Sequence, residues 1–97
     1  MQESLTIMIG APATGKTSWA NQNGKIELYG LCNRGANKIT QQVEDALSKG
    51  HQWEQLAISV MPNELHNCLI ENSESDLAFL ERASQLWPGK PVRVIRF

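Results

Sequence analysis

Apolar side chains follow two spacings along this chain, and each spacing predicts a different kind of element. Residues 5–9 and 56–60 are short apolar runs with the length of a strand, the first of them expected to be buried on both faces. Residues 25–29 alternate between polar and apolar side chains, which indicates another strand. A last strand is predicted at residues 91–97, where Pro91 comes first and misses no ladder hydrogen bond.

Helical spacing separates these strands. The predicted helices cover residues 16–22, a segment after Asn37 that Lys49-Gly50 closes, residues 63–71, and a segment from Ser73 or Ser75 to Trp87. The residues expected to face the core are Ile39, Val43, Ala46 and Leu47 in the second helix and Leu77, Leu80, Ala83 and Trp87 in the last. The alternation predicts one α/β domain over residues 1–97, a three-layer sandwich with a mainly parallel sheet of about four strands.

The composition indicates a folded domain and limits the classes of partner that it is expected to bind. Of the 97 residues, 41% are hydrophobic and 20% are charged, and the net charge of −1 gives nucleic-acid binding no support. No apolar run approaches the roughly 20 residues of a membrane-spanning helix, and the N-terminus lacks the basic region of a signal peptide. Cys32 and Cys68 are too widely spaced for a disulfide framework or a zinc site. We therefore expect a cytoplasmic protein that is not attached to a membrane.

Residues 10–17, Gly-Ala-Pro-Ala-Thr-Gly-Lys-Thr, have the Gly-x-x-x-x-Gly-Lys-Thr spacing of a phosphate-binding P-loop (Walker A motif). Glycines let the chain curl so that backbone N–H groups point at phosphate oxygens, and the following helix adds partial positive charge. Lys16 supplies a full charge to the β- and γ-phosphates, and Thr17 supplies a hydroxyl ligand for Mg²⁺. The motif predicts a minimal P-loop NTPase-like fold that binds ATP or GTP with Mg²⁺; the alternative is a glycine-rich turn that binds nothing. The predicted binding residues are Gly10, Ala13, Thr14, Gly15, Lys16, Thr17 and Ser18.

A P-loop NTPase normally carries an acidic residue near the metal, at the end of a nearby apolar strand. The run at residues 56–60 and the Met-Pro pair that follows it contain no such residue. Three candidates remain open: Glu27 and Glu54, either of which could approach the metal, and Ser59, which could orient a metal-bound water. Because either glutamate is equally explained as a solvated surface residue, the sequence predicts binding more firmly than hydrolysis.

Arginines stabilise the charge of a phosphoryl group in transfer. Arg34, in the loop after the second strand, is the candidate catalytic residue beside Lys16, and Arg82 in the last helix is a second candidate. A surface position is the alternative for both. Arg93 and Arg96 fall on opposite faces of the last strand, which favours protection of an edge strand over a continuous basic stripe.

Residues 5–20 resemble the opening of the polynucleotide-kinase-like group of small P-loop kinases, in which a tryptophan and an alanine often follow the Lys-Ser/Thr pair, as Trp19 and Ala20 do here. The resemblance covers about a sixth of the chain. It implies an ATP-dependent phosphotransferase ancestry, with Lys16 and Thr17 as the phosphate and Mg²⁺ ligands. The aspartate that the group carries after its second strand has no evident counterpart here.

A second resemblance covers residues 50–82, which look like the later part of FtsK/HerA-type translocating ATPases. In those proteins a strand that ends in a polar residue and a proline precedes a short helix and an asparagine, as residues 56–60, Pro62 and Asn72 do here. This resemblance implies a DNA-related motor ancestry, and an acidic strand between this strand and the P-loop strand.

These observations favour a small ATP- or GTP-binding P-loop protein with weak NTPase or phosphotransferase activity. The first alternative is a non-catalytic nucleotide-binding accessory or regulatory protein of a phage or mobile element. The second is a DNA-associated ATPase subunit that completes its site between protomers, with Arg34 or Arg82 acting in trans. A protein partner or self-association stays open, and so does nucleic acid, which the net charge does not favour.

Overall fold

The computed structural model describes residues 3–10, 14–29, 36–60 and 76–97. In chain order its elements are β1 (Leu5–Ile9), α1 (Lys16–Gln22), β2 (Ile26–Tyr29), α2 (Ala36–Ser48), a short 3₁₀ helix (Trp53–Gln55), β3 (Leu56–Val60), α3 (Asp76–Leu86) and β4 (Val92–Arg96). Four predicted strands and three of the predicted helices are therefore confirmed. The helix predicted at residues 63–71 and the caps Ser73 and Ser75 lie outside the described residues.

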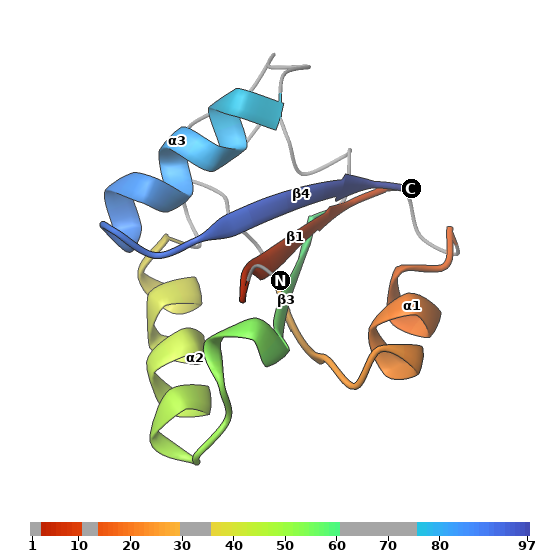
Figure 1. The fold of residues 1–97 in the computed structure, drawn as a ribbon, viewed down its shortest axis with the longest axis horizontal. Helices are drawn as coiled ribbons and strands as arrows, with labels where there is room; N and C mark the ends of the chain where they lie inside the picture. The colour runs from red at the N-terminus through yellow and green to blue at the C-terminus, as the bar shows by residue number, and fades with distance from the viewer. Residues whose placement is uncertain (1–2, 11–13, 30–35, 61–75) are drawn as a thin grey trace.

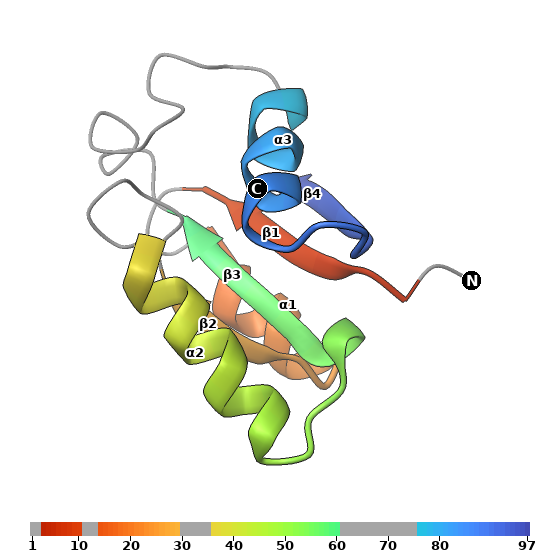
Figure 2. The same ribbon diagram turned by 90° about the vertical axis from the view of Figure 1, so that its left-hand side faces the viewer.

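The four strands form one sheet in the order β2-β3-β1-β4, and every neighbouring pair is parallel. The chain moves from β1 past β3 to β2, then returns through β3 and passes β1 to reach β4. Because crossovers between parallel strands are right-handed, reversing the direction of travel moves the connecting helix to the other face of the sheet. Accordingly α1 covers one face alone, whereas α2 and α3 cover the other (Figures 1 and 2). This arrangement confirms the predicted three-layer α/β fold.

The two faces of the sheet carry cores of different size. On the side of α2 and α3 lies the main cluster of buried side chains: Leu5, Ile7, Ile9, Leu28, Ile39, Val43, Ala46, Leu56, Ile58, Val60, Phe79 and Ala83. On the side of α1 the buried cluster contains only Met8, Ala20 and Ala57 among the described residues, with Trp19 packed against it. The main core holds the sheet together, and the thin core under α1 leaves room for polar side chains on that face.

Two predicted core residues are exposed instead. Leu47 of α2 is 40% exposed, because it is rotated by about 80° from Ile39 around the helix and lies beyond the buried stripe. Leu77 of α3 is 61% exposed, whereas Phe79, which the predicted stripe omitted, is fully buried. At about 100° per residue, Leu77 and Phe79 point to opposite sides of the helix, so only one of them can face the sheet.

None of the helices in the described ranges is long and apolar enough to span a bilayer.

Candidate phosphate-binding site

The motif at residues 10–17 begins where β1 ends, at the carboxyl edge of the sheet. β1 and β3 are hydrogen-bonded neighbours, and the helices that follow them in the chain, α1 and α3, cover opposite faces of the sheet (Figure 1). In open α/β sheets such a switch point leaves a crevice at the carboxyl ends of the strands, where ligands bind. The motif therefore stands at the position that the topology itself provides for a ligand.

The ammonium group of Lys16 lies at this switch point. The side chain is only 6% exposed, and Nζ donates hydrogen bonds to the carbonyl oxygens of Gly10 at 2.6 Å and Val60 at 3.5 Å. Gly10 follows β1 and Val60 ends β3, so one cation joins the carboxyl ends of both strands. Because a carbonyl carries only a partial charge, an anionic oxygen would be a stronger acceptor for this buried ammonium.

Gly10 lies in a crowded position beside Thr14 and the C-terminal Phe97. A Cβ at this position would lie 2.8 Å from Cβ of Phe97 and 2.8 Å from Oγ1 of Thr14. Hydrogen bonds fix this crowding, because Gly10 N donates to Val60 O and Phe97 N donates to Ile9 O. Only glycine fits here without movement of its neighbours.

We expect Gly10→Ala to destabilise the protein by about 1–3 kcal/mol, the usual cost of forcing an extra methyl group into a filled space. Urea unfolding followed by circular dichroism measures the change. The exposed Ser18→Ala in α1 is the control and should stay within about 0.5 kcal/mol of wild type. Equal stability of Gly10→Ala and wild type would show that Phe97 moves to make room for the methyl group at little cost in free energy.

The remaining predicted binding residues have different environments. Gly15 has a φ of +100°, a conformation that favours glycine, immediately before α1 begins. Thr14 and Ser18 are exposed. Ala13 and the predicted catalytic residue Arg34 lie outside the described residues, so their predicted roles stay predictions.

Arg82, Arg93 and Arg96 belong to two elements of the described chain, α3 and β4, and Arg96 pairs in register with Ile9 at the end of β1. Arg82 belongs to α3, on the face opposite α1, and its Nη1 donates to Oε1 of Gln85 at 3.2 Å. Arg93 stacks over the ring of Trp19 and Arg96 over that of Phe79, on opposite faces of the edge strand β4. The prediction that Arg93 and Arg96 form no common stripe is confirmed.

Thr17, the predicted metal ligand, contacts an acidic residue that is distant in the sequence. Its hydroxyl donates to the carboxylate of Glu27, with Oγ1 at 3.0 Å from Oε1 and 3.2 Å from Oε2. The hydroxyl of Tyr29 also donates to Oε1 of Glu27, at 3.0 Å. The first turn of α1 and the facing side of β2 thus bring two hydroxyl groups to one carboxylate.

Glu54 and Ser59, which the sequence also left open for the acidic role, differ from Glu27 in position. Glu54 lies in the 3₁₀ helix before β3, at the amino end of a parallel strand and therefore at the opposite edge of the sheet from the motif. Ser59 is buried in β3 and pairs in register with Met8 of β1 and Tyr29 of β2. Of the two glutamates, only Glu27 reaches the motif.

Sequence reasoning missed Tyr29, although its position carried a signal. Side chains two residues apart in a strand share a face. Glu27 and Tyr29 therefore lie on the same face of β2. The hydrogen bond to the Glu27 carboxylate, and next the negative charge of that carboxylate, raise the pKa of the Tyr29 hydroxyl. Deprotonation of Tyr29 would break the hydrogen bond and place two like charges side by side.

We expect Glu27→Gln to lower the pKa of Tyr29 toward the ordinary value of about 10, because the amide removes the charge and weakens the hydrogen bond. Tyr29 is the only tyrosine of the chain, so the ultraviolet absorbance of tyrosinate during an alkaline titration reports on it alone. Glu54→Gln is the control with the same change in charge and should titrate like wild type. If Glu27→Gln and wild type titrate alike, the hydroxyl is not bonded to this carboxylate in solution.

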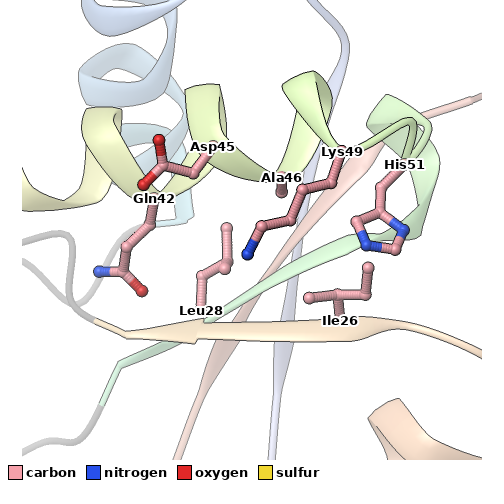
Figure 3. A pocket seen from close by; sticks show the side chains of 7 residues that line it. All are labelled: Ile26, Leu28, Gln42, Asp45, Ala46, Lys49 and His51. Carbon is pink, nitrogen blue, oxygen red and sulfur yellow. The ribbon is translucent and has the colours of Figure 1, made fainter.

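A cavity of about 230 Å³ lies between β2 and α2 (Figure 3). Its lining residues are Ile26, Leu28, Gln42, Asp45, Ala46, Lys49 and His51. Leu28 points to the face of the sheet opposite Glu27, so the sheet separates this cavity from Thr17. Gln42 accepts a hydrogen bond from Tyr29 N at 3.3 Å and donates one to Tyr29 O at 3.2 Å. Gln42 thereby covers backbone of the edge strand β2.

Comparison with known proteins finds no match to a family model, to a curated protein or to a solved structure. The described residues also contain no group of three or more histidine, cysteine, aspartate or glutamate side chains that could enclose a metal ion. Oxygen ligands do suit Mg²⁺, which is usually held by one or two protein groups together with phosphates and water. Thr17 and Glu27 fit that pattern.

Proposed function

We propose that residues 10–17 bind the phosphates of ATP or GTP together with Mg²⁺, and that the protein has weak NTPase or phosphotransferase activity. The observation that carries this proposal is the buried Lys16 ammonium at the switch point between the carboxyl ends of β1 and β3. A cation held there by carbonyl dipoles has the position and the chemistry to take up phosphate oxygens.

Each residue then has a distinct role. Lys16 exchanges its carbonyl acceptors for oxygens of the β- and γ-phosphates, and the Thr17 hydroxyl ligates the metal. Mg²⁺ held by Thr17 would neutralise phosphate charge and polarise the γ-phosphoryl group. Arg34 is the candidate for the side chain that stabilises the charge of the group in transfer. The activity is expected to be weak because β3 ends in Ser59 and Val60 rather than in an acid.

Nucleotide binding without catalysis, in an accessory or regulatory protein, is the second candidate, and the same non-acidic end of β3 favours it. The DNA-associated ATPase gains less support. Its resemblance implies an acidic strand between the P-loop strand and residues 56–60, whereas β3 is hydrogen bonded directly to β1.

Calorimetric titration with ATP and GTP, with and without Mg²⁺, tests the proposal, and phosphate release is followed in the same samples. We expect wild type to bind nucleotide and Lys16→Ala to lose this binding. Binding with slow phosphate release supports the enzyme, and binding without release supports the accessory protein. If wild type does not bind at millimolar nucleotide, the motif is a structural turn and the proposal is wrong.

A further inference from the structure

The hydrogen bond between Thr17 and Glu27 determines where the lone pairs of Thr17 point. A hydroxyl group has one proton to donate and two lone pairs to offer. Because Thr17 donates its proton to Glu27, both lone pairs of Oγ1 are directed away from the carboxylate. A hydroxyl in this orientation is prepared to ligate a cation.

Glu27 keeps acceptor capacity while it orients Thr17. An ionised carboxylate has about four lone-pair positions, and the described donors to it are the hydroxyls of Thr17 and Tyr29. The bond from Tyr29 fixes the carboxylate through Oε1, which leaves a lone pair of Oε2 for a further donor. A water molecule bound to a cation is such a donor, and it is attracted by the negative charge as well.

The packing under α1 makes this contact possible. Ala20 of α1 and Ala57 of β3 are buried in the same cluster and carry no side chain beyond Cβ, so the helix approaches the sheet closely. Glu27 pairs in register with Ala57 and therefore projects from the neighbouring strand toward the same helix. The reach of Thr17 to Glu27 thus follows from small residues at the centre of this face.

We infer that Glu27 is the positioning acid of the metal site: it holds the Thr17 hydroxyl with its lone pairs toward Mg²⁺ and accepts a hydrogen bond from a metal-bound water. This inference rests on the proposed nucleotide binding and names the acid that the end of β3 lacks. The acid comes from β2, the strand that follows α1 in the chain, rather than from β3, the strand beside β1.

The test is calorimetric titration with ATP in EDTA and with ATP in excess Mg²⁺, for wild type, Glu27→Gln, Glu54→Gln and Lys16→Ala. Glutamine at position 27 keeps the Oε1 acceptor that both hydroxyls use, so it removes the charge with little change in structure. Glu54→Gln makes the same change in charge at the far edge of the sheet. Circular dichroism confirms that each variant is folded.

We expect Mg²⁺ to tighten ATP binding by wild type and by Glu54→Gln. Glu27→Gln should bind metal-free ATP at least as well as wild type but lose most of the gain from Mg²⁺, since removing an outer partner of a metal ligand costs about 10–100-fold in metal affinity. Lys16→Ala should lose binding under both conditions.

Contrary outcomes separate this inference from the proposed function. If Glu27→Gln keeps the full gain from Mg²⁺, or if wild-type binding is independent of Mg²⁺, the inference is wrong while nucleotide binding stands. If folded Glu27→Gln loses metal-free ATP as well, Glu27 shapes the loop rather than the metal site, which also overturns the inference. If wild type binds no ATP, both proposals fail together.

Discussion

Replacement of Lys16 by methionine is expected to lower the affinity for nucleotide at least about 100-fold while the stability of the protein changes by less than about 2 kcal/mol. The Lys16 side chain is 6% exposed, and its ammonium donates to the carbonyl oxygens of Gly10 and Val60. Burying a charge costs free energy that hydrogen bonds to dipoles offset only in part. Methionine keeps the length and volume of the stem and removes that cost, but it also leaves the carbonyl oxygen of Gly10 without this donor, so the two effects on stability oppose each other.

The affinity for nucleotide should change more than the stability does. A hydrogen bond to a charged group contributes about 1.5–3 kcal/mol, and Lys16 is proposed to bind two phosphates. We therefore expect the affinity for ATP to fall at least about 100-fold, which corresponds to about 2.8 kcal/mol. Calorimetry measures the affinity, and urea unfolding measures the stability of the same samples.

Lys25→Met is the matched control. The ammonium of Lys25 also donates to a backbone carbonyl, that of Glu54, but at the amino end of β3. This variant should bind ATP like wild type. A loss of more than about 2 kcal/mol of stability in Lys16→Met would mean that Lys16 clamps the strand ends as a structural residue, as expected if the motif is a turn that binds nothing.

The boundaries of the elements could be predicted from the sequence because local chemistry fixes them. β1, α1 and β3 were predicted with the residues at which they begin and end, and the α1 boundary follows from Asn23 and from Gly24, whose φ is +65°. The last two residues of the predicted loop before α2, Ala36 and Asn37, are instead its first turn. Local signals thus located the four strands and the three described α-helices to within one or two residues.

The site could be predicted only in part because its second half depends on a long-range contact. The motif itself is continuous in the sequence, and its glycines and Lys16 identify it. Thr17 and Glu27 are ten residues apart, and the hydrogen bond between them exists only because a crossover brings β2 under α1. Sequence spacing left Glu27 and Glu54 equivalent. The structure distinguishes them, because Glu27 accepts a hydrogen bond from Thr17 whereas Glu54 lies before the amino end of β3.

The sequence-based prediction of which face of α3 is buried was wrong in part. Apolar residues surround most of this helix, so two overlapping stripes fit a helical spacing. The predicted stripe began at Leu77, whereas the observed one contains Phe79 and Ala83 with Leu86 beside them. Propensity and spacing alone do not choose between the two, because the choice depends on the position of the sheet.

Phe79→Ala is therefore expected to be the most destabilising substitution in α3, at about 3–5 kcal/mol. Phe79 is fully buried in the main core, and Arg96 stacks over its ring at 6.0 Å, so the truncation loses packing on both sides of the side chain. A domain of this size has a total stability of about 5–15 kcal/mol, so the loss is a large part of it. Urea unfolding of Phe79→Ala measures the effect, and Phe79→Leu, expected to cost about 1 kcal/mol, provides a folded intermediate.

Leu77→Ala is the control that decides which stripe faces the sheet. Leu77 is 61% exposed, so its truncation removes little buried surface and should change stability by less than about 0.5 kcal/mol. The sequence-predicted stripe reverses this order, with the larger loss at Leu77. A larger effect of Leu77→Ala than of Phe79→Ala would therefore mean that α3 is rotated by about a quarter of a turn about its axis in solution, and that Arg96 does not lie over a core aromatic ring.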